Sequence, residues 1–225
     1  MDDGLSLLYP RVCLSCGKNI RAFEEALCLH CQYKLPKTNF HEEQENPMTE
    51  HFWGRVKIEY GASFYYFKKG GLVQQLIHNL KYENKPEIGL RLGQLYGKVL
   101  KKSPFFSQVE AIIPVPLHPR KEKMRGYNQS ARFAQGLSLG METPWAMALN
   151  RTMMTATQTK KARIERFSNV EHAFEVVKPN FIKGKHILLV DDVITTGATL
   201  EACAHQLLTL PDTKVSVATI AFAEQ

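Results

Sequence analysis

The chain has no long hydrophobic run. None of its segments reaches the roughly 18 to 20 apolar residues that a helix needs to cross a bilayer. It also lacks the pattern of a secretory signal, because its first apolar run is short, covers residues 5–9 and follows two aspartates rather than a basic segment. The sequence therefore predicts no transmembrane segment and a cytoplasmic location.

Acidic residues are in deficit, with 22 Asp and Glu against 29 Lys and Arg, which leaves a formal net charge of +7. A basic protein attracts anionic partners because its long-range field raises the local concentration of phosphates. Charge alone does not distinguish DNA, RNA or a nucleotide from a merely soluble basic protein. The length of 225 residues is enough for one main domain and a small accessory module.

Cysteine is also scarce, and four of the five cysteines form the pairs Cys13-x-x-Cys16 and Cys28-x-x-Cys31. Two such pairs are typical of a zinc site rather than of a disulfide framework. Four thiolates close the coordination shell, so the sequence predicts a structural Zn²⁺ rather than a catalytic one, with a redox dithiol as the alternative. Cys203 stands alone and is expected to be a small buried side chain.

A module of this size buries little core, so its folding is expected to depend on the metal. The acidic, apolar-poor residues that follow it are typical of a linker. We therefore predict a zinc-binding module over residues 1–40, a linker over residues 41–54 and the main domain over residues 55–225.

The middle of the chain predicts strands and helices. Residues 56–67 are rich in β-branched and aromatic side chains and are broken by Gly61, which indicates a strand pair or a bent strand. These aromatic residues are expected to pack a sheet, with a base-stacking surface as the alternative. Apolar residues at helical spacing then predict amphipathic helices near residues 72–80 and 88–99.

A basic segment follows the next predicted strand. Residues 109–117 form an apolar run ended by prolines, as expected for a buried parallel strand. Five basic or imidazole side chains come next, in residues 118–125, before a helical pattern that starts after Gly126. A strand, a basic loop and a helix N-terminus in this order suit a pyrophosphate group, whereas a solvated charge run is the alternative.

The most informative segment covers residues 187–199. Four apolar residues precede Asp191 and Asp192, and a loop with hydroxyl side chains and Gly197 leads into a helix that is expected to end near residue 210. In open α/β sheets the ligand crevice lies at the carboxyl ends of the strands. The loop amides and the helix dipole favour a phosphate, and the acidic pair can accept hydrogen bonds from ribose hydroxyls and approach Mg²⁺.

This segment therefore predicts a ribose-phosphate site. It is not a Walker loop, because the Gly-Lys-Ser/Thr ending is missing. The residues predicted to bind the 5′-phosphate are Val193, Ile194, Thr195, Thr196, Gly197, Ala198 and Thr199.

The same segment resembles the phosphoribosyl pyrophosphate (PRPP) signature of type I phosphoribosyltransferases, and the whole chain resembles the ComF family of competence and DNA-utilisation proteins. Features shared with that family, besides the four cysteines, are Leu80-Lys81-Tyr82, residues 113–119, Arg125-Gly-Tyr-Asn-Gln129, Gln158 with Arg166 and Asn169, and Ala173-Phe174. The resemblance implies an α/β, type I phosphoribosyltransferase-like fold. A central, mostly parallel sheet is flanked by helices and preceded by a small zinc-ribbon-like module.

The resemblance also implies roles for individual residues. PRPP or another ribose 5-phosphate ligand would bind with Mg²⁺, and Asp191 and Asp192 would be the catalytic carboxylates. The residues implied on the pyrophosphate side are Pro116, Leu117, Arg125 and Asn128. The residues implied in the hood loop are Gln158, Lys160, Lys161 and Arg166, of which Lys161 stands where the family more often has an apolar residue.

At the level of function, the resemblance implies a protein of DNA uptake or natural competence that binds Mg-PRPP and single-stranded DNA and works with the DNA-uptake machinery. The alternative is an active phosphoribosyltransferase of nucleotide metabolism or salvage without a direct role in DNA binding. Nothing in the sequence specifies an acceptor nucleophile, so the sequence leaves open whether the chain catalyses transfer.

Overall fold

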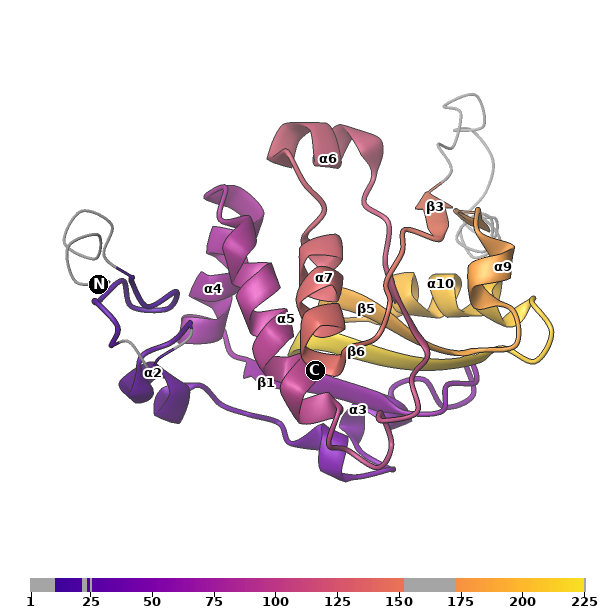
Figure 1. The fold of residues 1–225 in the computed structure, drawn as a ribbon, viewed down its shortest axis with the longest axis horizontal. Helices are drawn as coiled ribbons and strands as arrows, with labels where there is room; N and C mark the ends of the chain where they lie inside the picture. Colours follow the sequence, from indigo (N-terminus) through magenta and orange to yellow (C-terminus); the bar gives the residue numbers. More distant parts are fainter. Residues whose placement is uncertain (1–10, 22–23, 25, 152–172, 225) are drawn as a thin grey trace.

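The centre of the molecule is a four-stranded parallel sheet in the order β1-β6-β5-β2 (Figure 1). The computed structural model describes residues 11–21, 24, 26–151 and 173–224. The strands are β1 (Gly61–Phe67), β2 (Ala111–Pro114), β5 (His186–Ile194) and β6 (Lys214–Ala223). The predicted parallel sheet is confirmed, and β5 and β6 are almost continuously buried because both of their faces are covered.

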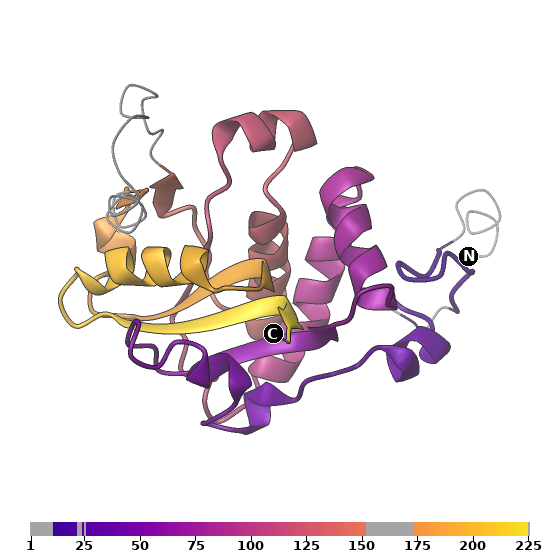
Figure 2. The ribbon, with the colours of Figure 1, turned by 180° about the vertical axis from the view of Figure 1, so that it is seen from behind.

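Helices cover the two faces of this sheet. On one face lie α4 (Leu72–Tyr82), α5 (Pro86–Leu100) and α7 (Gln129–Met141), while α10 (Ala198–Leu208) lies on the other, as the opposite views of Figures 1 and 2 show. The predicted helices near residues 72–80 and 88–99 are confirmed as α4 and α5. Most of the apolar side chains of these two helices are buried in the core, and Leu72, Leu95 and Val99 are partly buried against it.

Helices α5 and α7 touch through glycines. A Cβ atom added to Gly136 of α7 would lie 2.0 Å from the carbonyl oxygen of Leu90, and one added to Gly93 of α5 would lie 2.3 Å from the carbonyl oxygen of Phe133. Such distances are shorter than any real Cβ contact, so the two backbones pack directly against each other. The glycines thereby set the distance between α5 and α7.

The strand near residue 61 differs from the sequence-based expectation. Gly61 begins β1 rather than breaking a strand, and residues 56–60 approach the sheet as irregular backbone. The amide of Glu59 donates to the carbonyl of Val215 at 2.7 Å, which holds this approach against β6. The segment therefore forms a single strand rather than a strand pair, and a Cβ atom on Gly61 would lie 2.8 Å from the side chain of Met48, so the glycine makes room for α3 (Pro47–Glu50).

The basic segment after β2 is the short helix α6 (Pro119–Arg125) rather than the expected loop. Pro119 stands at the first helical position, where its missing N–H costs no hydrogen bond, and Gly126 ends the helix at a φ of 80°. None of the side chains of α6 is buried. The helix therefore projects its charges into solvent beyond α7.

Residues 41–54 contain the short helix α3 (Pro47–Glu50) and pack against β1. The buried side chain of Asn46 donates to three backbone carbonyls and accepts from the amides of Met48 and Thr49. Met48 and Phe52 are fully buried. Met48, Phe52 and the fully hydrogen-bonded Asn46 thus hold against β1 a segment that has the composition of a linker. The boundaries of the zinc-binding module, the linker and the main domain stay a prediction.

The remaining elements are small. They are α2 (Leu29–Lys34), the 3₁₀ turn η1 (Phe40–Glu42), α9 (Pro179–Ile182) and the antiparallel pair β3 (Leu149–Arg151) and β4 (Phe174–Val176). Across the described residues, every helix is too short or too polar to cross a membrane.

Candidate functional site

The acidic pair lies in the carboxyl-terminal half of β5. Ser130 Oγ of α7 donates to Asp191 Oδ1 at 2.7 Å, and the amide of Asp192 donates to the same oxygen at 2.8 Å. Lys81 Nζ, from the last turn of α4, lies 2.9 Å from Asp192 Oδ2. Burial raises the pKa of Asp191 to about 7, and repulsion from Asp192 adds to this effect. Two helices, α4 and α7, therefore converge on the two carboxylates of β5.

The loop after β5 encloses a small pocket. Asp191 and residues 193–200 line a volume of about 50 Å³, far below the roughly 300 to 1,000 Å³ typical of pockets for drug-sized ligands. Gly197 stands at the N-cap of α10 with a φ of 70°, and having no side chain it makes no capping hydrogen bond to the first turn of the helix. Uncapped amides at a helix N-terminus favour an anion, so the pocket suits a group the size of a phosphate.

The predicted phosphate residues contribute in different ways. Thr195, Thr196 and Ala198 are exposed, Val193 and Thr199 are half-buried, and the side chain of Ile194 belongs to the core. Ile194 therefore lines the pocket from within the sheet, whereas the threonines reach solvent.

An arginine far away in the sequence braces this loop. Arg55 Nη1 donates to the carbonyl of Thr196 at 3.0 Å, and Arg55 Nη2 pairs with Glu201 in the first turn of α10. A Cβ atom added to Gly197 would lie 2.8 Å from the ring of His51, so the same segment also packs against the glycine. No spacing in the sequence links Arg55 to the loop, and only the fold brings them together.

The predicted pyrophosphate residues lie beside the acidic pair. The amide of Val115 donates to the carbonyl of Val190 at 2.9 Å, so Pro116 and Leu117 leave the sheet next to Asp191. Asn128 caps α7 by accepting from the amide of Ala131, and its side chain donates to the carbonyl of Val115 at 3.0 Å. Asn128 therefore ties the loop after β2 to the N-terminus of α7.

Two buried donors at this place have no acceptor among the residues that the structure describes. Arg125 Nη1 donates to Gln129 Oε1 at 3.0 Å, but Arg125 Nε and Gln129 Nε2 have no hydrogen-bond partner among the described residues. Gln129 is only 2% exposed. Buried donors are nearly always paired in folded proteins, so this pair indicates a place for an acceptor such as a phosphate oxygen.

The end of α4 joins these parts. The hydroxyl of Tyr127 donates to the carbonyl of Leu80, Lys81 pairs with Asp192, and the guanidinium of Arg125 lies 5.3 Å from the centroid of the Tyr82 ring. Leu80-Lys81-Tyr82 is among the features that the chain shares with the ComF family, but the sequence assigns it no role. Lys81, Ser130 and Arg55 are site residues that the sequence reasoning missed.

Other expectations divide into those that the structure describes and those that it does not. The predicted hood residues Gln158, Lys160, Lys161 and Arg166 lie outside the described residues. Phe64 and Tyr65 are buried, so packing of the sheet, rather than base stacking, is confirmed for them. Cys203 is fully buried in α10, as expected.

The four N-terminal cysteines come together. Their sulfur atoms all lie within 4.8 Å of one another, and those of Cys16 and Cys28 are 3.7 Å apart. Tetrahedral zinc with Zn–S bonds of about 2.3 Å requires sulfur atoms about 3.8 Å apart. Burial opposes ionisation of Cys13, yet hydrogen bonds from the backbone of Cys16 and Cys28 lower its pKa to about 7. The cluster fits a closed metal site.

Glu24 fixes the loop between the two cysteine pairs. Its carboxylate accepts from the amides of Arg21 at 2.6 Å and Leu29 at 2.7 Å. These hydrogen bonds from the amides of Arg21 and Leu29 keep the pKa of Glu24 below its usual range. A loop held in this way brings Cys28 back to Cys13.

Known proteins resemble this chain in sequence. Residues 128–225 match the phosphoribosyl transferase domain family. A DNA utilization protein, YhgH, of Escherichia coli O157:H7 is 37% identical over 137 residues, which are 59% of this chain and 60% of that protein, so the match spans about 60% of the relative's length. Competence protein F of Haemophilus influenzae is 30% identical over 212 residues, which cover 92% of this chain and 88% of the relative.

Solved structures resemble it more weakly. An allosteric regulatory enzyme of purine biosynthesis has a TM-score of 0.45 at 18% identity and covers 64% of this chain and 30% of its own. Adenine phosphoribosyltransferase from Leishmania donovani has a TM-score of 0.40 at 14% identity and covers 70% of this chain and 83% of its own. Similarity at this level supports no inference about what the chain does.

The parallel sheet, the matched domain and the loop after β5 define a type I phosphoribosyltransferase-like protein that is preceded by a four-cysteine cluster. The near full-length match to competence protein F is more specific. The chain belongs to the family of competence protein F, the ComF family.

Proposed function

We propose that the chain is a ComF-like protein of DNA uptake that binds Mg-PRPP in the site at the end of β5 and also binds single-stranded DNA. One observation carries the first part of this proposal. The phosphate pocket, the acidic pair and the orphan donors Arg125 Nε and Gln129 Nε2 adjoin one another at one edge of the sheet. A 5′-phosphate, a ribose and a pyrophosphate are joined in the same order in PRPP.

Each group of this chain has a role in that complex. The pocket of residues 193–199 would anchor the 5′-phosphate, Asp191 and Asp192 would accept from the ribose hydroxyls, and Arg125 with Gln129 would donate to the pyrophosphate. Mg²⁺ would neutralise charge on the pyrophosphate, and carboxylate oxygens are suitable ligands for it. Binding of this kind relies on positioning and on charge stabilisation.

The DNA-binding part is supported by charge and by relatives. Relatives of this chain are named competence protein F and DNA utilization protein. Helix α6 presents three exposed basic side chains, Arg120, Lys121 and Lys123, and a single exposed acidic one, whereas Arg125 at its end is half-buried. Cationic side chains that contact phosphates give an affinity for single strands that falls with salt, with a log–log slope of about −0.7 per contact.

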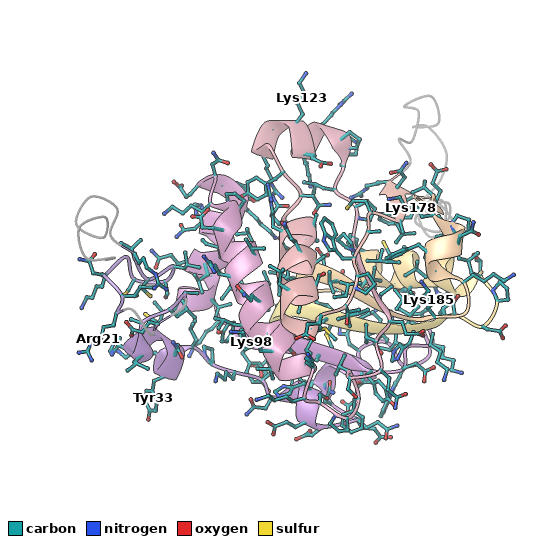
Figure 3. All side chains as sticks on the ribbon, in the orientation of Figure 1. Arg21, Tyr33, Lys98, Lys123, Lys178 and Lys185 are labelled. Atoms are coloured by element: carbon teal, nitrogen blue, oxygen red, sulfur yellow. The ribbon has the colours of Figure 1, made fainter. Side chains whose placement is uncertain are left out.

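A salt titration of a short fluorescent oligodeoxynucleotide tests this part. Wild-type affinity is expected to fall steeply with salt. The double variant Lys121→Ala with Lys123→Ala should flatten the slope. Lys178→Ala with Lys185→Ala, beside α9 and away from α6, is the matched control (Figure 3). An absence of binding at low salt would contradict a direct role on DNA.

The second candidate function is catalysis of phosphoribosyl transfer in nucleotide metabolism or salvage. The placement of both carboxylates beside the pocket favours it, since it is the arrangement that transfer from ribose C1 would need. Release of pyrophosphate from PRPP with a panel of base and amine acceptors tests it. Turnover of PRPP that depends on one acceptor and is lost in Asp191→Asn would establish an enzyme. Binding of PRPP without its consumption by any acceptor would support only the proposed role in DNA uptake.

A further inference from the structure

The end of α4 carries an exposed aromatic ring next to the ribose-phosphate site. Tyr82 is the last residue of α4, and its side chain is 62% exposed. Its neighbour Lys81 pairs with Asp192, so the residue that carries the ring directly follows the one that contacts the acidic pair. A tyrosine as exposed as this one contributes little to the core.

The ring belongs to a small stack of flat groups. The guanidinium of Arg125 lies over it at 5.3 Å from its centroid, and the ring of His78, one turn earlier in α4, lies 5.0 Å away at an angle of 48°. Arginine and aromatic side chains are the groups on which nucleobases stack in proteins that bind single strands. Arg125 joins this stack to the proposed pyrophosphate side through Gln129.

Positive charge surrounds the stack. Arg125 ends α6, whose exposed Arg120, Lys121 and Lys123 stand clear of the body of the molecule beside the end of α4, and Lys123 points outward at its tip (Figures 1 and 3). The same helix exposes 74% of Met124. Cationic side chains beside exposed apolar and aromatic groups provide the two components of sequence-tolerant strand binding, which are phosphate neutralisation and stacking.

We infer that Tyr82, with Arg125 and His78, is a stacking platform for a nucleobase of single-stranded DNA, whose backbone lies along the basic side chains of α6. This inference rests on the proposed function, because it names the residues that would receive the strand. The base-stacking role is thereby assigned to Tyr82 rather than to the aromatic residues of β1, because the rings of Phe64 and Tyr65 are buried and pack the sheet. Through Arg125, the platform adjoins the unpaired donors on the proposed pyrophosphate side of the site.

The test compares two oligodeoxynucleotides of equal length and charge, one with bases and one abasic, in binding titrations by fluorescence anisotropy. Wild type should bind the base-bearing strand about fivefold or more tightly than the abasic one, because stacking contributes about 1 to 3 kcal/mol per base. Tyr82→Leu should bring this ratio close to one, and Tyr82→Phe should keep it. Tyr33→Leu, which removes a tyrosine that is 92% exposed in α2, is the matched control and should also keep it.

Equal affinity of wild type for the two strands, or an unchanged ratio in Tyr82→Leu, would overturn the platform. A second comparison uses a nucleoside monophosphate and ribose 5-phosphate. If the base raises affinity only in this pair of small ligands and not in the oligodeoxynucleotides, the stack binds a free nucleotide, and the proposed binding of a DNA strand is wrong. PRPP, which has no base, is titrated into the same preparations. If wild type does not bind PRPP, the proposed PRPP site is refuted. If wild type binds PRPP but has equal affinities for the base-bearing and abasic strands, only the platform is refuted.

Discussion

Lys81 Nζ lies 2.9 Å from Asp192 Oδ2, so the last turn of α4 supplies a counter-ion to the acidic pair on β5. Asp192 is buried, and a buried carboxylate without a partner would be costly. Asp191 has a hydrogen bond from Ser130 instead, and no cation of the described residues lies within ion-pair distance of it. The two neighbouring carboxylates therefore lie in different surroundings, with a lysine ammonium beside Asp192 and a serine hydroxyl beside Asp191.

This difference predicts a dependence of stability on pH. Burial, followed by repulsion from Asp192, raises the pKa of Asp191 from 3.8 to about 7, so the folded protein binds a proton that the unfolded chain has lost. The contribution of Asp191 to the free energy of unfolding is therefore complete below about pH 4 and is lost as the pH rises to about 7. Asp191→Asn should gain stability relative to wild type across this window, as measured by urea unfolding at several pH values. A difference between the two proteins that does not vary with pH would contradict the assignment.

Much of this site follows from the sequence, and the reasons are local. Strand β5, the loop at Gly197 and α10 are consecutive in the chain, so their apolar run, carboxylates and glycine predict both the fold and the phosphate pocket. The four cysteines are likewise close together in the chain, and their Cys-x-x-Cys spacing alone predicts a metal site. In contrast, Arg55 lies 141 residues from Thr196, and Lys81 belongs to a helix whose pattern reports only its buried side. Helix α6 was not predicted, because its dense basic charge indicated a loop, although Pro119 and Gly126 are typical of a helix start and a helix end.

The metal cluster makes a direct prediction. The protein should contain about one equivalent of zinc, because four thiolates close a tetrahedral shell. The double variant Cys28→Ser with Cys31→Ser should lose the metal and the order of the N-terminal module, whereas Cys203→Ser should keep both. Metal analysis after dialysis, with limited proteolysis of the N-terminus, measures this. An unchanged zinc content in the double variant would refute the site.

Arg55 is expected to act on the ligand through the loop. Arg55→Ala removes the donor to the carbonyl of Thr196 and the pairing with Glu201, so the phosphate pocket should be less well held. PRPP affinity should fall about five- to tenfold, which corresponds to about 1 to 1.4 kcal/mol, the usual contribution of one such hydrogen bond. Lys57→Ala, an exposed cation two residues away, is the control and should bind as wild type does. Equal affinities for both variants would remove the role given to Arg55.

The contact between α5 and α7 predicts an effect on stability alone. Gly136→Ala places a methyl group where the carbonyl of Leu90 stands, so the helices must separate. The free energy of unfolding should fall by about 1 to 3 kcal/mol, the usual range for overpacking. Leu139→Ala, on the exposed side of α7, should change it by no more than about 0.5 kcal/mol. Thermal or urea unfolding that ranks these two variants in the opposite order would contradict the packing described here.

The most direct test of the central claim is calorimetric titration of the intact protein with PRPP in the presence and absence of Mg²⁺. Wild type should bind PRPP, and Mg²⁺ should strengthen the binding. The double variant Asp191→Asn with Asp192→Asn keeps the size of the side chains and removes their charge. It should therefore remain folded while its affinity drops by about tenfold or more, equivalent to about 1.4 kcal/mol or more. An unchanged affinity in this folded variant, or no PRPP binding by wild type with Mg²⁺, would contradict the account.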